Sequence, residues 1–111
     1  MHMGSMAIVA DKTPKNYVHV VFNNGAHDSV GGQPTVGLKI NLPAIAKAVG
    51  YKSTISVDTK LELEQQLSKL AAQEGPVLVE VKVKKGNRKD LGRPTTTPQE
   101  NKNALMEFLK K

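Results

Sequence analysis

The chain passes repeatedly from short apolar runs to amphipathic stretches, and this pattern predicts three strands with helices between them. The β-branched, apolar run Tyr17–Phe22 shows little alternation and predicts a strand buried on both faces. Ser53–Asp58 predicts a second, shorter strand. Pro76–Val83 is apolar at its start and alternates toward its end, so it predicts a third.

Helices are predicted before the first strand and between the strands. The first helix is short and is expected to end near Asp11, because Pro14 biases the residue before it away from helical backbone. The stretch 41–50 begins with an asparagine suited to capping, carries proline in its first turn and ends on glycine, so it predicts a second helix.

A third helix is expected from residue 60, with Asp58 or Thr59 as its cap and Gly75 as its end. Its apolar residues fall at helical spacing: Leu63, Leu67 and Leu70. The stretch 98–111 predicts a last amphipathic helix. It offers four apolar side chains for docking: Leu105, Met106, Phe108 and Leu109.

This order of strand, helix, strand, helix, strand predicts an α/β fold. A βαβαβ core with short loops implies a parallel sheet with right-handed crossovers and helices on both faces, which makes three layers. We expect residues 1–111 to form one unit, in which 84–98 is a basic connecting segment and 98–111 the C-terminal helix. Three strands make a small sheet, so the pattern looks like half of a doubly wound domain.

The loop Asn23–Gly37 follows the first strand and is expected to hold no regular element, because glycines and a proline interrupt it. It is longer than the about 2–6 residues usual between a strand and a helix. Ligands of open parallel sheets bind beyond the carboxyl ends of the strands, where this loop begins. Its length and position therefore predict a functional loop.

The polar groups of this loop suit a cation and a small molecule. Asn23 and Asn24 offer amide oxygens, which are hard, neutral ligands for Mg²⁺ or Ca²⁺. Glycines allow close approach of the backbone to a ligand. The remaining polar side chains supply donors, acceptors and one imidazole: His27, Asp28, Ser29 and Gln33. The triplet Asn-Asn-Gly alone is typical of ordinary turns, so the hypothesis depends on the whole loop.

Composition narrows the class of protein. The sequence contains no cysteine, which excludes disulfides and cysteine zinc sites. Aromatic residues make up only 4%, so the core must be aliphatic. No apolar run is long enough to cross a bilayer and none resembles a secretory signal, so we expect no membrane partner and a cytoplasmic location.

Positive charge is concentrated in one segment. Residues 82–93 carry six basic side chains against Asp90 alone, in a chain whose formal net charge is +6. Such a segment could belong to a binding module that contacts nucleic acid phosphates. No aromatic residue interleaves the basic ones, so we favour a solvated or interdomain segment and expect no nucleic acid partner. Arg88 and Arg93 are candidates for a subunit contact or for attracting an anionic substrate.

The stretch "FNNGAHDSVGGQPTVG" resembles the second half of the signature of thiamine-diphosphate enzymes, which opens with Gly-Asp-Gly and closes with an asparagine pair. Together with "MHMGSMA" and "LGRPTTTP", it is similar to phosphonopyruvate decarboxylases and more loosely to sulfopyruvate decarboxylases. The resemblance covers essentially all 111 residues. It implies a partial thiamine-diphosphate-binding, Rossmann-like fold.

The resemblance also implies cofactors and roles. Thiamine diphosphate would bind through Mg²⁺, with the side-chain oxygen of Asn24 and the backbone carbonyl of Ala26 on the metal. The residues implied in cofactor binding are Asn24, Gly25, Ala26, Gly31 and Gly32. Candidates near the substrate are His27, Ser29 and Gln33.

The implied reaction belongs to phosphonate biosynthesis. A thiamine-diphosphate-dependent lyase of this kind decarboxylates 3-phosphonopyruvate to phosphonoacetaldehyde and CO₂. A sulfopyruvate decarboxylase and an acetolactate-synthase-like enzyme are alternatives within the same class.

Gly-Asp-Gly does not occur in the sequence, and by the family layout it would precede Met1. The resemblance therefore implies the C-terminal part of a diphosphate-binding domain. The activating glutamate would come from a pyrimidine-binding domain or another subunit, in a homo-oligomer. We expect the chain alone to be inactive, and take residues 1–5 as native because they continue the first helix. Another alternative is a catalytically silent protein with an exposed apolar sheet edge.

Overall fold

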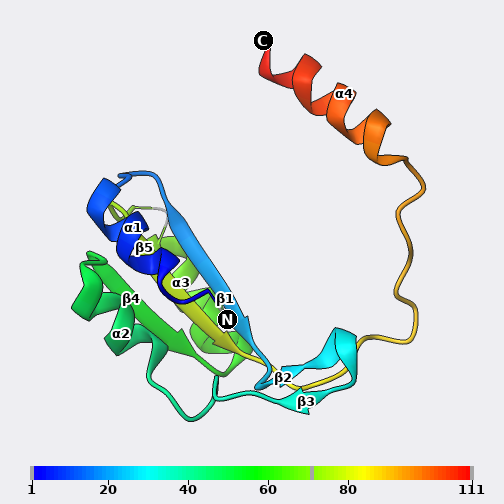
Figure 1. The fold of residues 1–111 in the computed structure, drawn as a ribbon. Coiled ribbons are helices and arrows are strands. Elements are labelled where there is room, and N and C mark those ends of the chain that lie inside the picture. The colour runs from blue at the N-terminus through cyan, green and yellow to red at the C-terminus, as the bar shows by residue number, and fades with distance from the viewer. Residues whose placement is uncertain (1, 71, 111) are drawn as a thin grey trace.

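The computed structural model describes residues 2–70 and 72–110, and three parallel strands form the centre of its fold. These strands are β1 (Val18–Asn23), β4 (Ser53–Val57) and β5 (Val77–Lys82), and their order across the sheet is β1-β5-β4. Figure 1 shows them running in the same direction. The predicted parallel α/β sheet is confirmed.

The last strand lies in the middle of the sheet and is the most deeply buried of the three. Val77 and Leu78 are fully buried, and Val79 nearly so. Both neighbouring strands align with its first residue, since Val18 and Ser53 each pair with Val77. Their carboxyl ends therefore meet at one end of the sheet.

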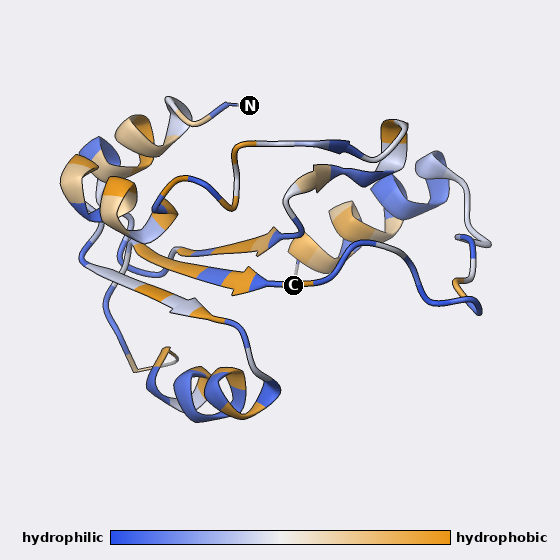
Figure 2. Ribbon diagram, turned by 90° about the horizontal axis from the view of Figure 1, so that it is seen from below, coloured by the Kyte–Doolittle hydropathy of each residue, from blue (hydrophilic) through white to orange (hydrophobic). Residues whose placement is uncertain are grey.

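Helices cover the two faces of this sheet. The first face carries α1 (Ser5–Lys12) and α2 (Leu42–Val49), and the opposite face carries α3 (Lys60–Leu70) (Figures 1 and 2). Alternate residues of β5 join different cores. Leu78 packs on the first face in one cluster: Met6, Ala10, Ala46 and Tyr51. Val77, Val79 and Val81 lie on the other face with Val57 and Leu70. The three predicted layers are present.

The helix ends follow the predicted signals in two cases. Asn41 caps α2, where its Oδ1 accepts a hydrogen bond from the Ala44 N–H at 3.0 Å, and Gly50 ends the helix in the left-handed region. Thr59 caps α3 by accepting the Glu62 N–H at 3.2 Å. These local side-chain bonds explain why short helices begin where they do.

The prediction that α3 continues to Gly75 is wrong. It ends at Leu70, and Leu67 remains 53% exposed. The Gln73 N–H bonds back to the Leu70 carbonyl, and the Gly75 N–H donates to the Lys15 carbonyl at 2.6 Å. The chain therefore leaves the helix early because Gly75 must reach the residues that precede β1, which sets the start of β5.

The prediction that the first strand is buried on both faces is also wrong. Val18, Val20 and Phe22 are 44%, 48% and 70% exposed. Among the described strands β1 pairs only with β5, and these three side chains lie opposite Val77, Val79 and Val81, on the face that carries α3. The buried cluster around α3 is built from β4 and β5 and leaves this part of β1 uncovered.

The C-terminal helix α4 (Pro98–Leu109) forms where it was predicted, but none of its residues is buried. Its four docking side chains are 50–71% exposed. Figure 1 shows it standing apart from the three layers at the end of an extended connection. Residues 83–97 contain no helix or strand.

The loop after β1 was predicted to hold no regular element, and this prediction is wrong. It contains a small antiparallel hairpin of β2 (Ala26–His27) and β3 (Gln33–Pro34), joined by the 3-10 turn η1 (Asp28–Val30). Gly31 and Gly32 adopt φ of +110° and +72°, and the Gly32 N–H donates to the His27 carbonyl at 2.9 Å. The glycines reverse the chain inside the hairpin, so they permit the pairing.

Candidate functional site

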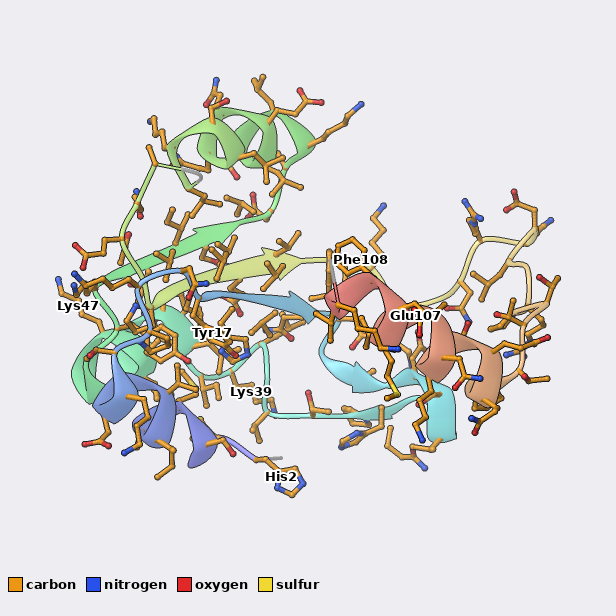
Figure 3. All side chains as sticks on the ribbon, turned by 90° about the horizontal axis from the view of Figure 1, so that it is seen from above. His2, Tyr17, Lys39, Lys47, Glu107 and Phe108 are labelled. Carbon is orange, nitrogen blue, oxygen red and sulfur yellow. The ribbon has the colours of Figure 1, made fainter. Side chains whose placement is uncertain are left out.

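A groove of about 830 Å³ opens beside the carboxyl end of β1. The loop after the strand contributes four consecutive residues to its wall, Asn24 to His27. Further lining comes from α1, β1 and the return of the loop, including Met6, His19 and Lys39. Figure 3 shows His2 and Lys39, which also line it, on the α1 side of the sheet, opposite α3.

Asn23 holds the two ends of the loop together. Its side chain is buried, and Nδ2 donates to the Gly37 carbonyl at 2.8 Å and to the Glu80 carboxylate at 2.7 Å. Its Oδ1 accepts the Gly25 N–H at 3.1 Å. Burial and these three hydrogen bonds give the first asparagine of the pair a structural role, although it also lines the groove.

Glu80 is a buried carboxylate that connects the ends of all three strands. It lies on the central strand β5, accepts from Asn23 of β1, and accepts the Ser56 hydroxyl of β4 at 2.8 Å. Glu80 was not among the residues predicted to form the site. A signal for it was present, since one acidic residue stands inside the otherwise apolar start of the strand "VLVEV".

Asn24 begins the turn Asn24–Ala26, and its side-chain amide is half-buried. Its Oδ1 accepts the Ala26 N–H at 3.0 Å, which brings together the two residues that were predicted to bind the metal. An amide oxygen has two lone pairs, so one remains for a cation. Gly25 makes the bend with φ of +67°, and a Cβ there would lie 2.6 Å from Cδ1 of Leu38. The left-handed φ favours glycine in this turn.

These two oxygen ligands suit a hard cation that takes its other ligands from phosphates and water. Asn24 Oδ1 and the Ala26 carbonyl are neutral oxygens, the ligand type that Mg²⁺ accepts beside phosphates and water. Within residues 2–70 and 72–110 no group of three or more histidine, cysteine, aspartate or glutamate residues is placed to hold a metal. A metal bound by protein side chains alone would need such a group.

The predicted substrate candidates separate in space. His27 lines the groove, whereas Ser29, Gln33, Gly31 and Gly32 do not contribute to its wall. They form the far end of the hairpin, where Ser29, Gly31 and Gln33 are exposed and Gly32 is half-buried.

A second histidine, His19, lines the groove from β1. Its Nδ1 lies 3.1 Å from the hydroxyl of Tyr51, and burial raises the pKa of that phenol above its ordinary value. The sequence alone does not single out His19, because it stands inside a strand. With His2 and His27, the structure places three imidazoles on this groove.

The comparisons with known proteins give the class of protein. Residues 1–81 match the family described as "Thiamine pyrophosphate enzyme, C-terminal TPP binding domain". The chain belongs to this family, and the resemblance noted in its sequence is confirmed. Thiamine pyrophosphate, another name for thiamine diphosphate, is therefore the cofactor that the family binds.

The relatives narrow the class further. The chain is 41% identical over 100 residues to phosphonopyruvate decarboxylase of Streptomyces viridochromogenes, covering 90% of this chain and 25% of that protein. It is 38% identical over 108 residues to phosphonopyruvate decarboxylase of Streptomyces hygroscopicus, covering 97% and 27%. The chain thus spans about a quarter of the length of these two relatives.

A more distant relative is sulfopyruvate decarboxylase subunit beta of Methanococcus maripaludis. Identity to it is 31% over all 111 residues, which cover 59% of that protein. In the part of this chain that the structure describes, none of the helices has both the length and the apolar character that a membrane span requires.

Proposed function

We propose that this chain forms the Mg²⁺ and diphosphate side of the active site in a thiamine-diphosphate-dependent decarboxylase. The reaction is conversion of 3-phosphonopyruvate to phosphonoacetaldehyde and CO₂, a step of phosphonate biosynthesis in the cytoplasm. The observation that carries the proposal is the turn Asn24–Ala26 on the groove wall at the carboxyl end of β1. Its presence in a chain 41% identical to a phosphonopyruvate decarboxylase supports this substrate.

Each residue of the turn has a distinct part. Asn24 Oδ1 and the Ala26 carbonyl bind Mg²⁺, and Gly25 provides the bend between them. Asn23 and Glu80 keep the turn in place from behind, because their hydrogen bonds tie it to the central strand. Thiamine diphosphate, when bound, supplies the electron sink that makes loss of CO₂ from a 2-oxoacid possible.

The hairpin supplies the groups nearest to the substrate. His27 stands on the groove wall and carries an imidazole able to donate or accept a hydrogen bond. Ser29 and Gln33, with Gly31 and Gly32, complete the hairpin beyond it. In this proposal they approach the 2-oxoacid when the rest of the active site is assembled around the groove.

The remainder of the site comes from outside these residues. Three of the sulfopyruvate decarboxylase relatives are named as beta subunits, which supports an assembly of more than one subunit. We place the pyrimidine-binding domain, with its activating carboxylate, on another domain or subunit and expect a homo-oligomeric enzyme. The 111-residue chain alone is then inactive, because it lacks an anionic metal ligand and that carboxylate.

A decarboxylase assay tests the proposal. The full-length enzyme that carries this chain is given 3-phosphonopyruvate, sulfopyruvate or pyruvate with thiamine diphosphate and Mg²⁺. The expected result is release of CO₂ and phosphonoacetaldehyde, abolished by a chelator, with 3-phosphonopyruvate giving the highest kcat/KM. The isolated chain is assayed beside it, and turnover by that chain would contradict the proposed division of the site.

Sulfopyruvate is the second candidate substrate. A sulfopyruvate decarboxylase subunit aligns with every residue of this chain and shares more of its own length with it than the phosphonopyruvate decarboxylases do. Higher kcat/KM for sulfopyruvate in the same assay would select this alternative. The higher identity to phosphonopyruvate decarboxylases favours the first.

A further inference from the structure

The basic segment that follows β5 folds back onto the hairpin of the site. The Gly86 N–H donates to Oδ2 of Asp28 at 2.6 Å, and Nζ of Lys85 donates to the Gly32 carbonyl at 2.8 Å. Parallel pairing explains why these residues meet. β1 and β5 end side by side, and the Val83 N–H continues the pairing to the Asn23 carbonyl at 3.0 Å.

Lys85 holds its ammonium group against the glycine turn. A Cβ built on Gly32 would lie 3.0 Å from Nζ of Lys85, so the ammonium group lies close against this glycine. On the neighbouring Gly31, a Cβ would lie 2.8 Å from the side-chain amide of Gln33. The Lys85 ammonium group therefore lies against Gly32, and the Gln33 amide lies against Gly31. Both groups can donate hydrogen bonds.

This ammonium is connected to the groove through one backbone hydrogen bond. The Gly32 N–H donates to the carbonyl of His27, which lines the groove. Lys85 is exposed, and only one of its three N–H donors is used by the Gly32 carbonyl. Asp28 is the acidic group beside it, and its carboxylate accepts the Gly86 N–H. The surrounding segment is strongly basic: Lys82, Lys84, Arg88 and Lys89.

We propose that Lys85 binds the anionic group on carbon 3 of the 2-oxoacid, a phosphonate or sulfonate, and that Asp28 positions Lys85 by holding Gly86. The inference rests on the proposed function. A 2-oxoacid of this kind carries two anionic groups, and its carboxylate leaves as CO₂. The group on carbon 3 stays charged throughout, so a cation that binds it stabilises ground state and transition state alike.

Uniform binding of this kind has a kinetic signature. Loss of the cation should raise KM and leave kcat unchanged. A charged hydrogen bond of this type corresponds to an about ten- to hundredfold change in affinity. Pyruvate has no charge on carbon 3, so loss of Lys85 should leave the KM for pyruvate unchanged.

The test uses the full-length enzyme with four substitutions. Lys85→Gln should raise KM for 3-phosphonopyruvate about ten- to hundredfold with kcat unchanged and with no effect on pyruvate. Lys85→Arg, which keeps the charge, should restore most of the affinity. Asp28→Asn should raise the same KM by a smaller factor. Lys89→Gln removes one charge from the same segment and is the matched control.

Several outcomes would overturn the proposal. Equal losses with 3-phosphonopyruvate and pyruvate would make Lys85 a structural residue. A changed requirement for thiamine diphosphate, with substrate KM unaltered, would assign Lys85 to the cofactor's diphosphate. A larger KM effect of Lys39→Gln, on the groove wall, would move the anion subsite there.

A binding measurement separates this inference from the proposed reaction. If the enzyme does not decarboxylate 3-phosphonopyruvate, the proposed function fails. The anion site is tested independently by titrating the 111-residue chain with methylphosphonate and following it by NMR. The amide signals of Gly32 and Gly86 should shift with methylphosphonate, and Lys85→Gln should abolish those shifts. Shifts that persist in Lys85→Gln would end the assignment of an anion site to this lysine.

Discussion

At the residue scale, the two asparagines after β1 differ in what their amides face. Asn23 is buried and makes three hydrogen bonds to the protein, whereas the half-buried Asn24 makes one within the turn. The sequence offers both amide oxygens for a cation. Burial and three bonds favour a structural role for Asn23, so the two residues require separate tests.

Asn23→Ala should destabilise the fold by about 1–3 kcal/mol, because it leaves the buried Glu80 carboxylate without the amide that donates to it. Urea unfolding of the isolated chain measures the change. Asn24→Ala is the control, since it removes one part-buried hydrogen bond within the turn and leaves no buried carboxylate without a donor. Equal losses of unfolding free energy in the two variants would contradict this division of roles.

Asn24→Ala should instead weaken Mg²⁺-dependent binding of thiamine diphosphate to the full-length enzyme. Removing a residue that only supports a metal ligand lowers metal affinity about ten- to hundredfold. Loss of the ligand Asn24 should lower the affinity for thiamine diphosphate by at least this factor. Calorimetric titration of thiamine diphosphate at fixed Mg²⁺ gives the affinity. Retention of full affinity in Asn24→Ala, with folding unchanged, would remove this residue from the metal site.

At the element scale, α4 depends on its own cap because it receives little support from packing. Thr97 and Glu100 form a capping box, in which the Thr97 N–H donates to the Glu100 carboxylate at 2.7 Å and the Glu100 N–H donates to the Thr97 hydroxyl at 3.3 Å. The bond from the Thr97 N–H lowers the pKa of the Glu100 carboxyl below its usual value. A helix of 12 residues without buried contacts is marginal in water.

Lowering the pH should therefore unravel the start of α4. A carboxyl whose pKa is lower in the folded state stabilises the helix above its unfolded pKa, and that contribution disappears as pH falls through the folded pKa. Carbon chemical shifts of residues 98–102 report helicity during an acid titration. Glu100→Gln should lose helicity at neutral pH and show a flatter titration, and an unchanged titration would exclude Glu100 as the cause.

At the scale of the whole molecule, β1 leaves an apolar strip on the sheet. Val18, Val20 and Phe22 alternate along its exposed face, and α3 does not cover them. Apolar strips on a strand with a free edge favour pairing with another surface. This arrangement agrees with the expectation that the chain works as part of a larger assembly.

The isolated chain should self-associate through this strip, and Phe22→Ser should shift it toward monomer. Light scattering over a range of concentrations measures the mass. Phe108→Ser on α4 is the matched control, since Phe108 is also 70% exposed but lies on the separate helix. If Phe108→Ser dissociates the assembly and Phe22→Ser does not, α4 forms the contact. A chain that stays monomeric before substitution would contradict the prediction.

The elements of the fold and the location of the site follow from local signals in the sequence. Apolar runs, helix caps and turn residues act over a few positions, so they predict the parallel α/β core, the caps Asn41 and Thr59, and the loop after β1 as the site. Tertiary structure decided the rest. Long-range contacts place β5 in the centre of the sheet, and the hydrogen bond of Gly75 to Lys15 accompanies the early end of α3. They also bring Glu80 to Asn23, 57 residues away in the sequence. Lys85 reaches the glycine turn in the same way, because the parallel pairing of β1 and β5 brings the segments that follow them to one end of the sheet.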